Sequence, residues 1–370
     1  MDPVAHTFTG AALAAAGLRR TTPLACAALL LGANAPDVDV LASFAGGYEA
    51  IAFRRGWTHG VLALAIWPFA LAGVLLLWDR WFRRRRDPTA APARAGPLLL
   101  LAALAVVTHP TLDWLNNYGL RWLMPFDGRW FYGDALFIVD PWIWLTLGGA
   151  SFLTFSRSRL ALARWTVFWS SASLVVLAST ALVPPFARVL WVLALVVLVA
   201  ARALGRNARP RALERAAQAA LGVAAVYIVA MVALSAAARV EVRETLAARG
   251  IGDVEQVMVA PAAADPFGGA VVAVTPGEYY TGRWNWLADP RLALGTERIP
   301  RPRGPVFDAA AQAPEARDFL SWARFPSVEL EPAADGGTVV RFFDVRYRSG
   351  ERLDGPTVHL DRGLGALPAR

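Results

Sequence analysis

A histidine and an aspartate four residues apart, His109 and Asp113, close an apolar stretch that covers residues 97–114. The chain holds only 4 histidines, and three of them lie in its first third, interleaved with the motif Pro36-Asp37-Val38-Asp39. Imidazoles and carboxylates that come from separate apolar segments are typical of a metal site. The residue types and their spacing therefore predict metal chemistry.

The candidate ligands stand at the ends of apolar segments, and the topology below places all of them on one side of a membrane. They are His6, Asp37, Asp39, His59, His109 and Asp113. Ionisable groups near lipid cost a few kcal/mol, so they usually pair or line an aqueous cavity. A divalent cation would satisfy them together. Nitrogen and oxygen ligands suit zinc, which we expect first, or manganese or iron. Two ions about 3.5–4 Å apart would clamp a phosphoryl group and activate a hydroxide.

Each of these residues also has a simpler interpretation. His6 fits an interfacial residue near the terminus, and the two aspartates beside Pro36 fit a helix end that meets water. The sequence Arg55-Gly56-Trp57-Thr58-His59 fits an ordinary loop in which Thr58 caps the next helix. Their placement on the same side favours the metal site over these separate explanations.

Two further aspartates precede the next apolar segment. Asp134 fits an interfacial polar residue within an aromatic belt of tryptophans and tyrosine. Asp140 lies in a more apolar context, where a carboxylate that does not itself bind the metal can orient a metal-binding histidine by accepting a hydrogen bond from it. His359 is far from the other histidines in sequence and is interpreted as a surface or strand residue.

The composition indicates a membrane protein. Of the 370 residues, 56% are hydrophobic, and the mean hydropathy of +0.40 is too high for a typical soluble domain. The 37 basic residues are all arginine, which we attribute to a GC-rich coding sequence. The net charge of +8 is therefore no evidence for a nucleic-acid partner, and none is predicted. The single cysteine, Cys26, allows no internal disulfide.

A bilayer span takes about 20 apolar residues. Five segments meet this length, with a sixth and shorter one at 186–201 behind Pro184-Pro185. The five are residues 60–81, 97–114, 135–155, 165–183 and 215–237. Upstream, residues 4–18 and 23–35 predict two short helices, which form a hairpin that either spans or re-enters the membrane. The start Met1-Asp2-Pro3 lacks the basic region of a secretory signal, so we expect it to be retained.

Arginine runs fall in alternate loops, which the positive-inside rule assigns to the cytoplasm. They are Arg19-Arg20, Arg80 with 83–86, Arg157 with Arg159 and Arg164, and Arg202 with Arg206, Arg209 and Arg211. The candidate ligands and everything after Arg239 are then extracytoplasmic. Arg54, Arg55 and Arg121 are exceptions to this pattern.

From about residue 240 the hydropathy falls, and alternating patterns at 269–274, 328–330 and 338–345 predict strands. The expected fold is an all-α polytopic membrane bundle of about six to eight helices followed by a small β-rich soluble C-terminal domain. We divide it into a membrane core at 1–155, additional transmembrane helices at 156–239 and an extracytoplasmic domain at 240–370.

The motifs resemble a bacterial family of membrane-bound metal-dependent hydrolases, typified by YdjM and YfhP and also described as LexA-binding inner-membrane-associated hydrolases. The resemblance covers roughly residues 1–150, and many members have serine where this chain has Gly60. The matching motifs are Asp2-Pro3-Val4-Ala5-His6, Pro36-Asp37-Val38-Asp39, Arg55-Gly56-Trp57-Thr58-His59, His109 with Asp113, Tyr118-Gly119 and Asp140-Pro141-Trp142. The resemblance implies a bacterial inner-membrane location. A more distant similarity to zinc-dependent phospholipases C implies phosphoester or phospholipid substrates.

The leading hypothesis is an inner-membrane hydrolase in which metal-activated water attacks a phosphoester or ester of a lipid or another membrane-proximal substrate. In it, a carboxylate of the set that does not ligate, Asp39 or Asp113, acts as the base, and Arg54 or Arg55 binds a phosphate oxygen. Membrane lipids are the expected partners. The alternative is a scaffold or regulator with a structural metal, whose C-terminal domain binds a protein partner. A transporter would spread its ionisable residues through the membrane depth, which this sequence does not do.

Overall fold

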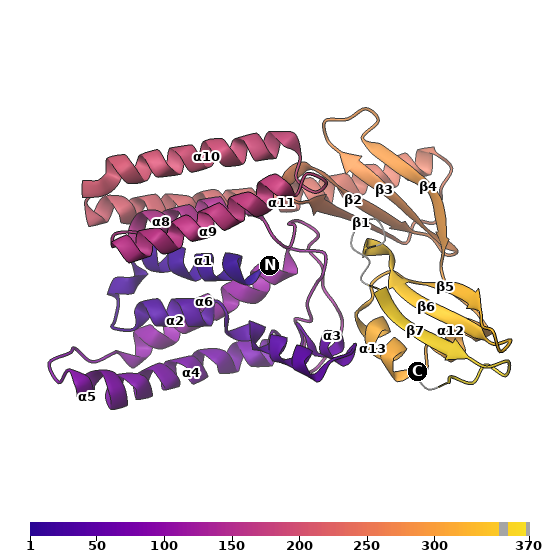
Figure 1. Ribbon diagram of the computed structural model, residues 1–370, viewed down its shortest axis with the longest axis horizontal. Helices are drawn as coiled ribbons and strands as arrows, with labels where there is room; N and C mark the ends of the chain where they lie inside the picture. The colour runs from indigo at the N-terminus through magenta and orange to yellow at the C-terminus, as the bar shows by residue number, and fades with distance from the viewer. Residues whose placement is uncertain (348–353, 368–370) are drawn as a thin grey trace. The chain divides into compact units, whose positions relative to one another are not determined.

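The computed structural model describes residues 1–347 and 354–367 (Figure 1). The chain forms two compact units, which are described separately. The helical unit comprises Met1–Val38, Arg55–Ser235 and Ala260–Pro266. The sheet unit comprises Asp39–Arg54, Ala236–Val259 and Phe267–Arg370. The segment Asp39–Arg54 thus belongs to the sheet unit, although Asp37 and the motif of His59 belong to the helical unit.

Long apolar helices make up most of the helical unit. They are α4 (Val61–Trp78), α6 (Ala95–Trp114), α9 (Arg159–Ala178), α10 (Pro185–Leu204) and α11 (Pro210–Ala248). Shorter elements complete it: α1 (Pro3–Ala15), η1 (Leu18–Arg20), α2 (Ala25–Gly32), η2 (Ala35–Ala45, which continues into the sheet unit), η3 (Asp79–Arg83), α5 (Arg84–Arg86), α7 (Pro141–Ile143), η4 (Trp144–Gly148), α8 (Gly149–Phe155) and η5 (Gly205–Asn207).

Five helices among the described residues have the length and hydropathy of a membrane span: Val61–Arg86, α6, α9, α10 and α11. The pair Ala25–Gly32 and Ala35–Phe44, bent by 47°, adds a broken span or a re-entrant loop. The span predicted at 135–155 is corrected. Its helix begins only at Pro141, because Asp140 caps it by accepting from Trp142 N at 2.9 Å, and three short pieces, α7, η4 and α8, form it. The sixth candidate is longer than predicted, since Pro185 occupies the first turn of a 20-residue helix.

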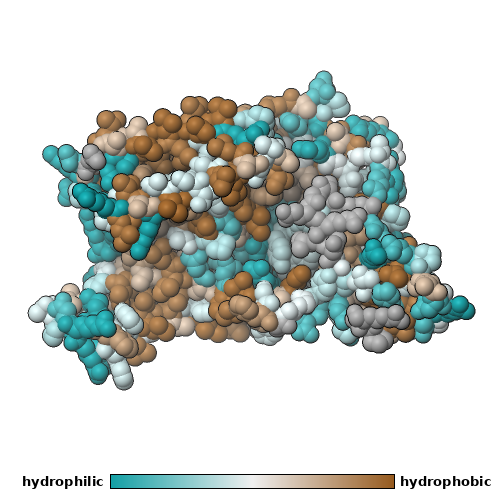
Figure 2. All heavy atoms as spheres, viewed as in Figure 1, coloured by the Kyte–Doolittle hydropathy of each residue, from teal (hydrophilic) through white to brown (hydrophobic). Residues whose placement is uncertain are grey.

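The outer surface of the long helices is apolar. Leu174 is 71% exposed, Val197 67% and Val226 71%, a pattern that suits lipid contact rather than water. Figure 2 shows this hydrophobic surface over the helical unit, with hydrophilic residues concentrated at the end where α5 lies.

The arginine-rich loops gather at one end of the helical unit, as the loop pattern predicts (Figure 1). Arg20 pairs with Glu214 at 2.6 Å, which joins the first of these loops to the start of α11, directly after the last of them. Arg94 N donates to Thr22 Oγ1 at 2.8 Å, and Arg202 Nε donates to Ser156 Oγ at 2.7 Å. The exceptions Arg55 and Arg121 are buried side chains, 4% and 9% exposed, so protein contacts rather than topology account for them.

The sheet unit contains two antiparallel sheets. The first has the order β1-β2-β3-β4, with β1 (Gln256–Ala262), β2 (Asp265–Val274), β3 (Glu278–Asn285) and β4 (Leu292–Pro300). The second has the order β5-β6-β7, with β5 (Pro326–Pro332), β6 (Thr338–Asp344) and β7 (Asp354–Leu360). The helical elements of this unit are α3 (Glu49–Phe53), α12 (Pro305–Ala310), α13 (Pro314–Trp322) and η6 (Val345–Tyr347). The structure therefore agrees with the expected fold class, a helical membrane bundle followed by a small sheet domain.

The last turns of α11 and the segment Asp39–Arg54 both pack within the sheet unit. Val242 and Leu246 of α11 are buried against Val257 and Trp284 of the first sheet. The α3 segment packs on α13, where the rings of Tyr48 and Phe319 meet edge to face at 5.8 Å. Helix α11 therefore runs well past the predicted limit of the membrane segment at residue 237.

The ion pair of Asp344 and Arg346 stabilises the second sheet. Both side chains are fully buried, and Arg346 NH2 lies 2.8 Å from Asp344 Oδ2. Burial raises the pKa of Asp344, but the adjacent Arg346 guanidinium outweighs it, so the pKa lies below its usual value. A depressed pKa in the folded state means that this stabilisation is present above the unfolded pKa and is lost as the pH falls through the folded one.

We expect Asp344→Asn to lower the stability of this sheet at pH 7 by about 3 kcal/mol, because Arg346 would remain buried without a counter-charge. The loss should shrink as the pH falls below the usual range of a carboxyl group, because the native carboxylate then also becomes protonated. Thermal unfolding of the full chain from pH 3 to 7 measures both effects. The exposed Asp361 supplies the matched control Asp361→Asn. An unchanged midpoint for Asp344→Asn at pH 7 would contradict this role.

Candidate metal centre

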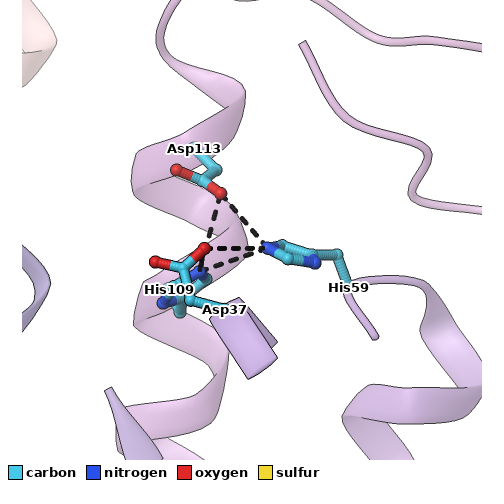
Figure 3. A group of neighbouring side chains, drawn as sticks. All are labelled: Asp37, His59, His109 and Asp113. Carbon is cyan, nitrogen blue, oxygen red and sulfur yellow. Dashed lines mark hydrogen bonds and ion pairs between the residues drawn. The ribbon is translucent and has the colours of Figure 1, made fainter. Parts of the chain in front are cut away.

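Four side chains from three segments of the helical unit converge on one point. Asp37 lies in η2 just after α2, His59 stands two residues before α4, and His109 and Asp113 lie one turn apart on α6 (Figure 3). Residues four apart share one helix face, which brings the last two together. Helix α6 continues through Pro110 to Trp114, so both residues belong to one continuous helix.

The donor atoms of these four residues all lie within 4.8 Å of one another. His59 Nε2 is 3.2 Å from His109 Nε2 and 3.3 Å from Asp113 Oδ2. His109 Nε2 is 3.5 Å from the same oxygen. Asp37 Oδ1 is less tightly held, at 3.6 Å from His109 Nε2 and 4.0 Å from His59 Nε2. Three donors thus form a tight triangle, and Asp37 closes it from a looser position.

This arrangement matches the dimensions of a metal site. Four ligands at about 2.0–2.1 Å from a tetrahedral ion lie about 3.3 Å from one another. The side chains of His59, His109 and Asp113 are 0% exposed, whereas that of Asp37 is 18% exposed. The cluster can therefore hold a divalent cation that is reached from the side of Asp37.

Backbone and hydroxyl groups fix the two imidazoles. His109 Nδ1 lies 2.7 Å from the Ala33 carbonyl oxygen, to which it donates, so its Nε2 lone pair faces the cluster. His59 Nδ1 lies 2.8 Å from Thr58 Oγ1. In the simpler interpretation of this motif Thr58 caps the next helix, and no sequence signal identifies a carbonyl such as that of Ala33.

The second oxygen of Asp113 is held by cationic groups. Arg55 NH2 lies 3.2 Å from Asp113 Oδ1, and the Met1 nitrogen also donates to this oxygen. Arg55 NH1 donates to Asn116 Oδ1 at 3.1 Å, and the guanidinium stacks over the Tyr118 ring at 4.5 Å. The Arg55 side chain therefore orients Asp113 rather than lining an open mouth. Sequence reasoning missed Asn116, although a polar residue directly after an apolar helix is a usable signal.

His6 lies beside the cluster but contacts it differently from the other histidines. Its ring stacks on that of His109 with centroids 3.7 Å apart, and its Nε2 is 3.3 Å from Asp113 Oδ1. Its Nδ1 is buried and has no hydrogen-bond partner among the residues that the structure describes. His6 thus supports Asp113 from the oxygen that faces away from His59.

The other predicted site residues are described by their own contacts. Asp39 and Arg54 belong to the sheet unit and face each other at 3.6 Å. Asp140 caps α7 and accepts from Tyr227 OH at 2.9 Å, so the described contacts of its carboxylate join helices and include no histidine. Asp134 is buried, and its carbonyl accepts from Ser235. His359 is exposed on β7.

Gly60 follows His59 at a place where backbone segments meet. A Cβ atom there would lie 2.3 Å from the Met124 carbonyl oxygen, and Val61 N donates to the Trp122 oxygen at 2.8 Å. The segment 122–124 thus occupies the space of a side chain. Many members of the family that the motifs resemble carry serine at this position. A serine side chain would clash with this backbone, so the close approach of segment 122–124 requires glycine here.

The fold and the cluster define a polytopic membrane protein with a candidate metal site. The family model described as YdjM inner membrane protein matches residues 1–203, more than half of the chain. The chain therefore belongs to this family. A second model, the YfhP C-terminal alpha/beta plait domain, matches residues 305–364.

Among curated proteins, the chain is similar to the uncharacterized protein YfhP of Bacillus subtilis (strain 168). The two are 29% identical over 119 residues, which is 32% of this chain and 33% of the relative. The match thus spans about a third of the length of the curated relative. No solved structure matches the chain.

Proposed function

We propose that this protein is a metal-dependent hydrolase of the inner membrane, acting on a phosphoester or ester of a lipid or another membrane-proximal substrate. The observation that carries the proposal is the triangle of His59, His109 and Asp113 with Asp37 at its more exposed side. Two imidazoles and two carboxylates suit zinc first, and manganese or iron as alternatives. When bound, such an ion polarises a phosphoryl or carbonyl oxygen and acidifies a water.

The chain's own residues divide the remaining work. His59, His109 and Asp113 would hold the ion, and Arg55 keeps Asp113 turned so that Oδ2 points into the cluster. Asp37 is the carboxylate with the most exposure and the longest distances, so it is suited to accept a proton from water as a general base. The role of Asp39 as a ligand or base stays a prediction, and so does phosphate binding by Arg54.

The depth of the cluster favours a membrane-proximal substrate. His59 precedes the span Val61–Arg86, and His109 and Asp113 close the span of α6. Ligands at the ends of membrane spans lie near the headgroup region, where lipid esters and phosphoesters are found.

The distribution of arginine supports an extracytoplasmic site. The 26 residues of Val61–Arg86 place about 39 Å between the start of α4 and the arginines at its far end. Short loops rich in arginine remain in the cytoplasm. The metal site and the C-terminal domain would then face the opposite side.

One observation favours a second function. Four protein donors can close a tetrahedral site completely, as in structural zinc sites, whereas catalytic sites keep a position for water. The protein would then be a membrane scaffold or regulator whose C-terminal domain binds a partner. The two functions differ in whether Asp37 is needed for metal binding or for turnover.

The test is hydrolysis by the full chain, purified in detergent and loaded with zinc or manganese, against a panel of phospholipids and aryl phosphodiesters. We expect turnover that a chelator abolishes and the metal restores. Asp37→Asn should retain the metal but lose about 10²-fold or more in kcat, because it removes the base. Asp361→Asn is the control. Metal-loaded protein without turnover on any substrate, or metal lost from Asp37→Asn, would favour the structural site.

A further inference from the structure

A pocket of about 450 Å³ lies within the sheet unit, between α11 and the loop that joins β3 to β4. Its lining carries charges of both signs. Glu241 and Thr245 contribute from α11, and Trp286, Asp289 and Arg291 contribute from the loop. None of the residues of the metal cluster lines this pocket.

The pocket lies just beyond the membrane-spanning part of α11. The apolar stretch of this helix ends at Ala238, and Arg239 is the first charge after it. Glu241 and Thr245 follow about one and two turns past Ala238, so they rise about 5 and 11 Å along the axis. This height corresponds to the headgroup layer that borders the hydrocarbon core.

The loop itself presents apolar side chains to its surroundings. Leu287 is 75% exposed and stands next to Trp286, whose ring contacts that of Trp284 edge to face at 5.1 Å. An exposed leucine beside tryptophan is a usual combination at a membrane interface. The position of the pocket on α11 and the surface of its loop therefore both indicate a lipid environment.

Two charged side chains of the pocket form an ion pair that is exposed to solvent. Arg291 NH1 lies 2.7 Å from Glu241 Oε1, and the two side chains are 46% and 36% exposed. An ion pair so exposed contributes little, so a ligand that satisfies both partners can replace it at small cost. The Arg291 guanidinium also lies over the Trp286 ring, 5.3 Å from its centre. Arg291 thus occupies the aromatic face that a quaternary ammonium group would need for a cation–π contact.

We propose that this pocket binds the headgroup of a zwitterionic phospholipid with a primary ammonium, of the phosphatidylethanolamine type. Arg291 would bind the phosphate, for which its planar fork is suited. Glu241 and Asp289, which both line the pocket, would accept hydrogen bonds from the ammonium group. Insertion of the zwitterion between Arg291 and Glu241 exchanges one exposed ion pair for two. The proposal does not depend on the metal chemistry of the helical unit.

The test compares lipids with the same acyl chains on the full chain in detergent, with native mass spectrometry as the readout. We expect phosphatidylethanolamine to bind more tightly than phosphatidylcholine and phosphatidylglycerol. Arg291→Gln should weaken ethanolamine and glycerol lipids alike, by about tenfold, because both lose the phosphate contact. Glu241→Gln should weaken only the ethanolamine lipid and abolish its advantage.

A matched control exists on the second sheet. Arg341 and Glu331 form an exposed pair at 3.0 Å, so Arg341→Gln makes the same change away from the pocket and should leave lipid binding unchanged. Equal binding of the three lipids, or full affinity in both pocket variants, would overturn the proposal. Soluble glycerophosphoethanolamine that binds as tightly as the lipid would overturn the assignment to a membrane ligand.

Discussion

Replacing His59 and His109 together by alanine is expected to remove the metal from this protein. Wild-type protein purified in detergent should carry about one equivalent of zinc, manganese or iron, and the double variant less than a tenth of it, because two of the three residues proposed to hold the ion are lost. Each lost donor costs affinity directly, and the loss of the second also frees the carboxylates from their common partner. Elemental mass spectrometry on matched preparations measures the difference.

The control uses the one histidine outside the first third of the chain. His359 is exposed on β7, so His359→Ala makes the same chemical change without touching the cluster and should retain full metal content. A second double variant, His59→Asn with His109→Asn, keeps more of the buried volume and guards against simple unfolding, which size-exclusion chromatography would reveal. Metal that persists in both double variants would refute the ligand assignment.

The composition of the site was largely predictable, because it depends on where helices end. His109 and Asp113 are one turn apart at the end of an apolar stretch, which places both on one face. Asp37 and His59 flank predicted helices, and the ends of these helices lie close enough to bring their donor atoms within 4.8 Å of those of His109 and Asp113. Alternation of arginine-rich loops added the direction of each helix, and the contacts of Arg20 and Arg202 agree with it.

Asp39 is a predicted site residue whose role as ligand or base stays a prediction. In the motif it is indistinguishable from Asp37, two residues away. The structure forms a 3-10 helix there, and with three residues per turn the two side chains project about 120° apart. The division of the chain after Val38 then assigns Asp39 to the sheet unit. Helix type and tertiary grouping are not encoded in a local pattern of four residues.

The remaining departures have the same origin in tertiary contacts. Asp140 was interpreted through its chemistry, but its carboxylate is used to start a helix and to bind Tyr227 on α11. Hydropathy falls after residue 237, yet α11 continues to Ala248 because Val242 and Leu246 pack against the first sheet. A hydropathy profile detects lipid-facing residues, and it cannot detect a helix whose buried face is covered by strands distant in sequence.

Arg55 offers the sharpest test of how the cluster is built. Its guanidinium contacts Asp113, Asn116 and the Gly119 carbonyl oxygen, the last at 3.4 Å. We expect Arg55→Gln to weaken metal binding by about 10- to 100-fold, because Asp113 loses the group that orients it. The unfolding free energy should fall by about 3 kcal/mol, since one partner of a buried ion pair is removed. Arg55→Lys should lie between, as it keeps the charge but loses the fork.

Arg54, the residue before this motif, provides the contrast, since its side chain is 31% exposed and pairs with Asp39. If an arginine here binds a phosphate of the substrate, Arg54→Gln should raise KM and leave metal affinity unchanged. Arg55→Gln should change metal affinity, measured by competition with a chromophoric chelator. Unchanged metal affinity with a raised KM in Arg55→Gln would instead assign Arg55 to the substrate. Arg55 holds Asp113 Oδ1 and so leaves Oδ2 free to bind the metal, whereas Arg54 pairs with Asp39. The two variants therefore distinguish a role in metal binding from a role in substrate binding.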